Sequence, residues 1–245
     1  MPAASQLERV KTVRHSAVVR VTHWLTFIAF MALLVTGGLI VISHPRFYWG
    51  EVGNVNTRPL FVIPIPSSRD MVPTGYHYVM PDENGWSRYL HFEAAWVLVL
   101  TALVYGIWGL WRGHFRKNLL PEKGSRLWRT CRDHVAQLLR RERPGHEEDG
   151  SYNVLQRIAY LVVIFILFPL IIWTGLAMSP AFTAAFPATA ALLGGRQSAR
   201  TIHFFDSGLL LVFLVVHVTM VVRSGFKSRM RAMILGYHRR SEEQE

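Results

Sequence analysis

Charged residues interrupt the hydrophobic pattern of this chain only at long intervals. Asp, Glu, Lys and Arg are absent, or limited to a single residue, in four stretches: 21–45, 92–111, 158–195 and 201–222. A helix needs about 20 apolar residues to cross a bilayer. The pattern therefore predicts four transmembrane helices, at about 24–43, 89–111, 154–178 and 201–222.

Four spans predict an all-α integral membrane protein, a four-transmembrane-helix bundle that forms a single domain over residues 1–245. With 51% hydrophobic and 18% charged residues, the composition disfavours a soluble enzyme, a secreted disulfide scaffold and a disordered chain. The single Cys131 excludes a thiolate-ligated iron–sulfur cluster within this chain. The charge-free segment 181–195 contains Pro187 and is too short to span, so we expect an interfacial helix or loop.

The basic residues predict the orientation of these helices. The N-terminus, the 112–153 connection and the C-terminus carry twenty of the 27 Lys and Arg residues. The positive-inside rule then makes both termini and loop 112–153 cytoplasmic, in a bacterial inner membrane. This topology, with attraction to anionic lipids of the bilayer, explains the net charge of +11, so no nucleic-acid partner is expected.

The predicted periplasmic loop, residues 45–88, is longer than most connections and rich in proline and aromatic residues. A folded cap, a docking surface and a mobile loop all remain open for it. Aromatic side chains are typical interface anchors. If the loop docks a protein together with segment 181–200, we expect contacts from Trp49, Tyr76 and Trp86.

Four of the eleven histidines lie in or at the ends of the spans: His23, His91, His203 and His217. His203 and His217 are fourteen residues apart, close to four helical turns, so they share one helix face about 21 Å apart. Helix direction places His23 level with His217 and His91 level with His203. Two histidine pairs at two depths predict two bis-histidine haems b stacked in the bundle.

Other residues complete this predicted site. Arg20 is available to the inner haem propionates, and Arg196 and Arg200 to the outer ones. Small residues would let the macrocycle approach the helices. These are Gly37, Gly38, Gly106, Gly109 and Gly175.

Three residues near the predicted outer haem have roles that the sequence leaves open. His44 ends the first helix and competes with His91 as a ligand, although we favour an interfacial role for it. Asp206 lies three residues after His203, where its carboxylate is placed to accept the second N–H of that imidazole or to serve a proton or quinone site. Glu93, two residues after His91, points away from it.

At these residues the sequence resembles the bacterial di-haem cytochrome b subunits of the Ni/Fe-hydrogenase, formate dehydrogenase and thiosulfate reductase type. The thiosulfate reductase branch is the most similar, and the resemblance covers nearly the whole chain. The long loop 45–88 departs from the hydrogenase and formate dehydrogenase branches, so their docking surfaces are not carried over to it. The segments that carry the resemblance are VRVTHW at 19–24, LHF at 90–92, YNVLQ at 152–156, TGLAMSP at 174–180 and GGRQSAR at 194–200.

The resemblance implies a subunit that links membrane quinone to a periplasmic redox enzyme, most plausibly a molybdopterin oxidoreductase. It also implies a quinone pocket near the cytoplasmic haem, where Asn153 and Gln156 offer amide groups to a quinone carbonyl. His15 is a candidate proton acceptor there. Two other functions remain open: a self-sufficient haem oxidoreductase that passes electrons between quinone and a small oxidant such as superoxide, and a haem-free transporter or anchor.

Overall fold

The computed structural model describes residues 15–54, 56–64, 84–118 and 154–236. Within this part of the chain, four helical segments are long and apolar enough to cross a membrane. They confirm the all-α membrane fold. The segments are α1 (Ala17–Ser43), α2 (Asn84–Trp111), the continuous α5 (Val154–Val162), η1 (Val163–Leu167) and α6 (Phe168–Met178), and α9 (Arg196–Arg223).

Three of the four helices begin earlier than the charge pattern predicts, and Arg88, expected in the loop, lies in α2. The pattern marks the apolar part of a span, whereas the helix continues into the headgroup layer. A helix of 28 residues such as α9 is about 42 Å long, which matches the thickness of a bilayer with its headgroups. The α9 start is also capped: loop residue Glu51 accepts the Arg196 N–H at 3.0 Å.

The third span contains one wider, π-helical turn, in which the Phe168 N–H donates to the carbonyl of Val163. Pro169 follows immediately. Proline has no N–H and its ring crowds the carbonyl four residues earlier. The wider turn accommodates Pro169 without breaking the helix.

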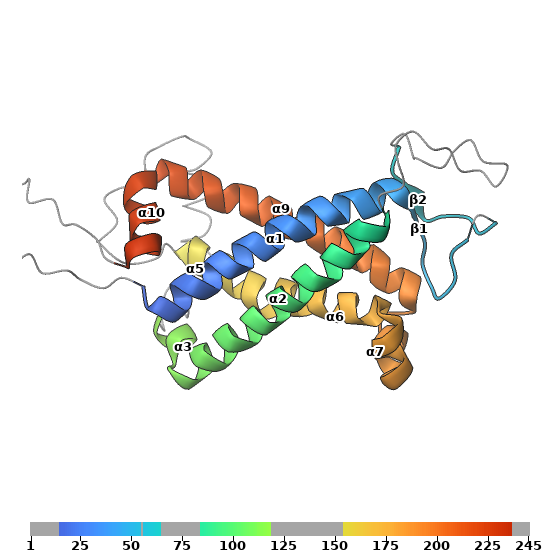
Figure 1. The fold of residues 1–245 in the computed structure, drawn as a ribbon, viewed down its shortest axis with the longest axis horizontal. Helices are drawn as coiled ribbons and strands as arrows, with labels where there is room; N and C mark the ends of the chain where they lie inside the picture. The colour runs from blue at the N-terminus through green and yellow to red at the C-terminus, as the bar shows by residue number, and fades with distance from the viewer. Residues whose placement is uncertain (1–14, 55, 65–83, 119–153, 237–245) are drawn as a thin grey trace, which may run out of the picture.

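The helices pack in two pairs, α1 against α2 and α6 against α9 (Figure 1). We call one end of the bundle the β end, because it carries the strands β1 (Arg46–Phe47) and β2 (Phe61–Val62). The short helices α7 (Pro180–Ala185) and α8 (Ala188–Ala191) lie there too. The other end, the α10 end, carries α3 (His114–Asn118) and α10 (Phe226–Leu235). Segment 181–195 thus forms two short helices, as expected for an interfacial segment.

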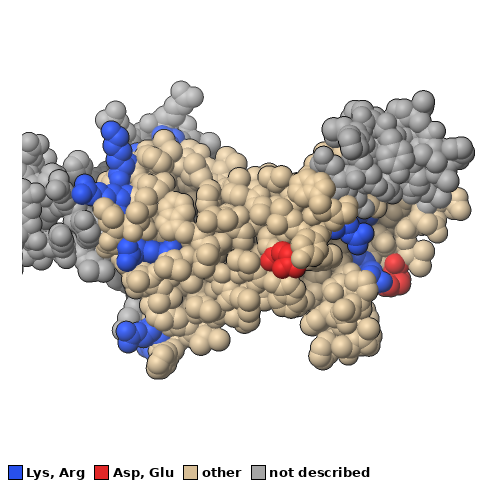
Figure 2. Space-filling model, in the orientation of Figure 1, with Lys and Arg blue, Asp and Glu red and all other residues tan. Residues whose placement is uncertain are grey.

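Lys and Arg gather at the two ends of the molecule in the face shown, with a largely uncharged belt between them (Figure 2). Large apolar side chains are exposed along the four spans, including Val35 at 59% on α1 and Ile107 at 66% on α2. Such exposure is unfavourable in water and appropriate to lipid. The chain is a multi-pass membrane protein.

At the β end, the loop after α1 folds back onto the first turns of α9. Strands β1 and β2 pair antiparallel, with Phe47 opposite Phe61. The Phe47 ring is buried and stacks on Phe61 at 4.8 Å while contacting Phe204 of α9 at 4.6 Å. This packing gives the described part of the loop a defined position above the bundle.

At the α10 end, a short helix that the sequence analysis did not predict returns to the start of α1. The Arg20 guanidinium donates to the Ile234 carbonyl at 2.7 Å, and the Trp24 indole N–H donates to Met233 at 3.3 Å. These bonds hold α10 across the end of the bundle.

Candidate functional site

Two of the four histidines meet near the β end of the bundle. His91 on α2 and His203 on α9 have ring centroids 6.3 Å apart. The structure thus brings together the pair that the depth argument expected. His44, the competing candidate, caps the end of α1, and its carbonyl accepts a hydrogen bond from Arg200.

The other two histidines meet nearer the α10 end. His23 on α1 and His217 on α9 have ring centroids 6.4 Å apart. Because His217 lies fourteen residues after His203 on one helix, the two pairs are about 21 Å apart along the α9 axis.

The separation within each pair fits one metal ion between two imidazoles. Each nitrogen of two opposed ligands lies about 2.0–2.1 Å from the metal and each ring centre about 1.1 Å further, so the centroids are about 6.3 Å apart. Both observed distances match this value. The residues present therefore suit two bis-histidine haem irons.

Threonine hydroxyls orient both rings of the β-end pair. Thr36 of α1 lies 2.9 Å from His91 Nδ1, and Thr174 of α6 lies 2.9 Å from His203 Nδ1. Both threonines are almost fully buried, at 1% and 0% exposure. With Nδ1 engaged, Nε2 is the nitrogen left for a metal.

A glycine follows each of these threonines and lies against the same imidazole. A Cβ added to Gly37 would be 3.5 Å from His91 Cε1, and one added to Gly175 would be 3.6 Å from His203 Cε1. No described atom lies within 4 Å of the position that a Cβ would take at Gly38 or Gly106, and Gly38 is exposed, so the structure gives these two glycines no contact with a histidine. Gly109 serves packing instead, because its added Cβ would lie 2.5 Å from the Phe115 ring.

The α10-end pair has aromatic surroundings rather than a pair of hydroxyl contacts. Phe213 stacks on His217 with centroids 5.8 Å apart, and Trp24 meets His23 edge-on at 5.5 Å. The Tyr160 hydroxyl of α5 lies 3.4 Å from His217 Nδ1. His23 Nδ1 is buried and has no hydrogen-bond partner among the residues that the structure describes.

The three arginines expected near haem propionates each bond to backbone carbonyls. Arg20 donates to Ile234, Arg196 to Met178 at 3.3 Å, and Arg200 to Arg46 at 3.1 Å and to His44. The Arg200 guanidinium also lies over the Phe47 ring, 4.8 Å from its centroid. Arg200 therefore fastens the loop to α9.

The two acidic residues near the β-end pair differ in environment. Asp206 is 2% exposed, and within the described ranges neither carboxylate oxygen has a hydrogen-bond partner. Of the two roles left open for Asp206, the first, accepting the second N–H of His203, is taken by Thr174 instead. Glu93 is exposed on α2.

Of the two amides expected to contact quinone, Asn153 and Gln156, only Gln156 lies in a described helix. Asn153 is outside the described residues, as is Tyr76 of the loop. Gln156 lies in α5, one turn before Tyr160, which contacts His217. His15 lies just before α1.

The site residues that the sequence analysis missed are Thr36, Thr174 and Tyr160. A signal for the threonines was present: a Thr-Gly dipeptide occurs in the first and third spans, at 36–37 and 174–175. Each lies on the helix that packs against the one carrying the histidine.

A four-helix membrane bundle with two stacked histidine pairs defines a b-type membrane cytochrome. The model of the prokaryotic cytochrome b561 family matches residues 14–236, and the chain belongs to this family. It is a haem b electron-transfer subunit of the membrane.

Two relatives support this assignment over most of their length. A chain from Azospira oryzae, named as protein-methionine-sulfoxide reductase subunit YedZ1, is 28% identical over 84% of this chain and 89% of its own. A chain from Cupriavidus necator, named as a Ni/Fe-hydrogenase B-type cytochrome subunit, is 25% identical over 91% and 85%. The resemblance to bacterial cytochrome b subunits is confirmed, whereas the thiosulfate reductase branch stays a prediction.

Proposed function

We propose that the chain binds two haems b and passes electrons between membrane quinone and a redox enzyme outside the membrane. His91 and His203 hold one iron, and His23 and His217 hold the other. The observation that carries this proposal is the pair of ring separations, 6.3 and 6.4 Å, at two levels of one bundle. When bound, each haem supplies one-electron exchange at its iron.

Haem counting in ligand variants tests the two-haem proposal. His203→Ala removes a ligand of the β-end iron and His217→Ala one of the α10-end iron, so each variant is expected to retain one haem per chain. His44→Ala is the matched control and should retain two. A parent protein with one haem, or loss of the same haem in both ligand variants, contradicts the proposal.

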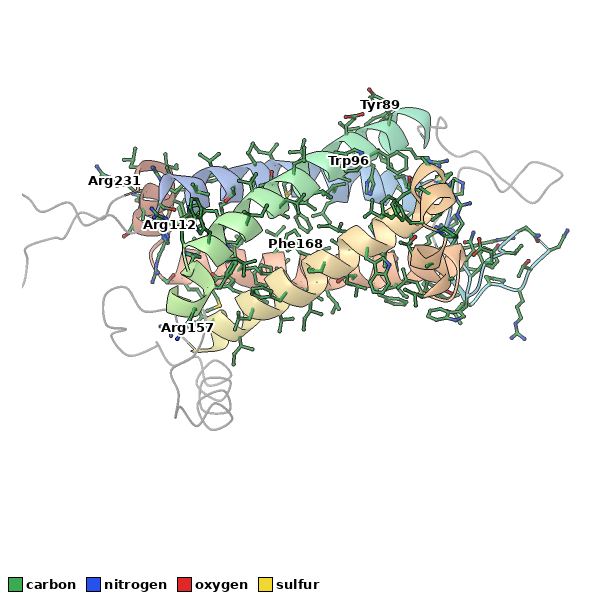
Figure 3. All side chains as sticks on the ribbon, turned by 90° about the horizontal axis from the view of Figure 1, so that it is seen from below. Tyr89, Trp96, Arg112, Arg157, Phe168 and Arg231 are labelled. Atoms are coloured by element: carbon green, nitrogen blue, oxygen red, sulfur yellow. The ribbon has the colours of Figure 1, made fainter. Side chains whose placement is uncertain are left out.

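We propose that the α10 end faces the cytoplasm of a bacterium, with both termini on that side of the inner membrane. Arg112 in the turn after α2, Arg157 in α5 and Arg231 in α10 lie at this end (Figure 3). The positive-inside rule supports the orientation. Cysteine accessibility at residue 227 and at residue 58, on opposite ends, tests it in intact spheroplasts, where only Arg58→Cys should react with an impermeant reagent.

The proposed quinone site lies at the start of α5, near the α10-end histidine pair. Gln156 is one helical turn from Tyr160, whose hydroxyl reaches His217. An amide can donate to and accept from a quinone or quinol oxygen. Asn153 is proposed as the second amide.

Quinol kinetics test this site. Gln156→Ala combined with Asn153→Ala should slow haem reduction by quinol while both haem spectra remain intact. Gln197→Ala, at the start of α9 on the β end, is the amide control. Unchanged kinetics in the double variant would overturn the assignment and favour a site near Asp206.

The β end is the proposed docking surface, formed by loop 45–88 with segment 181–200. Exposed apolar side chains gather here, including Trp49 at 60%, Phe186 at 58% and Leu192 at 74%. Trp86, at 50%, lies on α2 beside the loop. The two named relatives are subunits of redox enzymes, and we propose a molybdopterin oxidoreductase as the partner here.

Surface variants test the docking proposal. Trp49→Ser with Leu192→Ser should block electron exchange with a co-purified partner and leave the haem spectra unchanged. Trp111→Ser is the control, because Trp111 is 86% exposed and is the last residue of α2, at the other end of the bundle. If full exchange persists, or reduced haem reacts with superoxide without any partner, the docking role fails.

A further inference from the structure

The β-end histidine pair is supported by two equivalent elements, one in each helix pair. In the α1–α2 pair, Thr36 on α1 meets His91 on α2; in the α6–α9 pair, Thr174 on α6 meets His203 on α9. The distances are equal, at 2.9 Å. Each threonine is followed by a glycine that lies against the same ring.

The direction of these hydrogen bonds follows from the other contacts of each hydroxyl. Thr36 donates to the Ala32 carbonyl at 2.7 Å, and Thr174 donates to the Leu170 carbonyl at 2.8 Å. A hydroxyl has one hydrogen and two lone pairs. With its hydrogen used within the helix, each threonine oxygen accepts from the imidazole, so Nδ1 carries the proton.

A second carbonyl near each hydroxyl supports the same tautomer. Thr36 also donates to the Leu33 carbonyl at 3.3 Å, and Thr174 to the Ile171 carbonyl at 3.1 Å. Because a backbone carbonyl only accepts, each hydroxyl hydrogen is directed into its own helix and away from the imidazole. The two imidazoles are therefore held as Nδ1–H tautomers, each with the Nε2 lone pair directed away from the threonine.

The α10-end pair lacks this arrangement. Tyr160 is 3.4 Å from His217 Nδ1, beyond the usual range of a strong hydrogen bond. His23 Nδ1 has no hydrogen-bond partner within the described part of the chain. Each site offers two histidines, and the two sites differ in what contacts the second ring nitrogen.

We propose that Thr36 and Thr174 are positioning residues that fix the tautomer and orientation of the β-end ligands and lower the reduction potential of that haem. An imidazole that donates its second N–H becomes a stronger ligand, which favours ferric over ferrous iron. The inference rests on the proposed two-haem function.

The experiment compares isosteric and hydroxyl-retaining variants by spectroelectrochemical titration of both haems. Thr36→Val and Thr174→Val should raise the β-end potential and leave the α10-end potential unchanged. We expect a change of about tenfold in the ferric-to-ferrous ratio at fixed potential, which is about 59 mV for one electron. Thr36→Ser and Thr174→Ser should restore most of the parent value.

Each outcome decides between the inference and its alternatives. Loss of the β-end haem from the Val variants with retention in the Ser variants also supports the proposal, because it makes positioning depend on the hydroxyl. Equal shifts in Val and Ser variants, loss of haem in both, a shift of the α10-end haem, or no shift overturns it. A parent protein with a single haem overturns the two-haem function itself, which separates that failure from this one.

Discussion

Arg200 is expected to hold the loop in place, and removing its guanidinium should release the loop without removing a haem. Arg200→Gln eliminates two hydrogen bonds to backbone carbonyls, those of Arg46 and His44, and the contact with the Phe47 ring. Hydrogen bonds from a charged donor contribute about 1.5–3 kcal/mol each, and a cation–π contact about 0.5–2 kcal/mol.

The glutamine side chain should recover part of this interaction energy, so we expect the loop attachment to weaken by about 3–4 kcal/mol. This raises the equilibrium constant for opening of the loop by a factor of about 10²–10³. Hydrogen exchange measures this directly. The Leu60 N–H donates to Phe47 at 2.7 Å and the Ile63 N–H donates to Pro45 at 3.0 Å. Both amides should exchange about 10²–10³-fold faster in the variant.

Arg58→Gln is the control, because Arg58 is an exposed residue of the same loop and the substitution removes the same charge. It should leave both exchange rates unchanged. Unaltered exchange in Arg200→Gln would refute the tethering argument. Loss of the β-end haem with unaltered loop exchange would instead assign Arg200 to the propionates.

Two further substitutions test the local physics of the fold. Gly195→Ala should lower the free energy of unfolding of the detergent-solubilised protein by about 2–4 kcal/mol, because φ is +112° there and the new Cβ would lie 2.5 Å from the Gly50 backbone. Gly225→Ala is the control, because φ is also positive but the space is open, and it should cost less. Equal losses in the two variants would exclude the close contact as the cause. Burial lowers the pKa of His114, so the folded state binds this proton less well than the unfolded state, and stability should be lost as pH falls below about 6.5. His114→Phe should reduce the difference in melting temperature between pH 7.5 and pH 5.5. An unchanged difference would exclude His114 as its source.

The spans and the histidine pairs could be predicted because both follow from the order of residues along the chain. Excluding charge from the hydrocarbon layer sets the spans, and helical periodicity with alternating direction sets which histidines share a depth. The threonine contacts could not be predicted this way. They depend on how α1 crosses α2 and α6 crosses α9, which is set by packing across each pair.

The early start of α9 escaped prediction for a related reason. Its first N–H groups are satisfied by residues distant in sequence: Glu51 accepts from Arg196, and the Gly50 carbonyl accepts from Gln197 at 3.0 Å and Ser198 at 3.2 Å. Local capping signals are absent because Gly195 has no side chain. Only the folded loop supplies the acceptors.

The same turns of α9 support both the loop and the β-end histidine pair. Thr201 donates to the Tyr48 carbonyl at 2.7 Å, and His203 follows two residues later. Gly50 donates to the Ser198 hydroxyl at 2.8 Å, one turn further from the histidine. A partner bound to the loop, as we propose, would therefore contact a surface that is fastened to the helix carrying His203. Because the loop and His203 are attached to the same turns of α9, a partner docked on the loop would be positioned relative to the proposed β-end haem by a single helix.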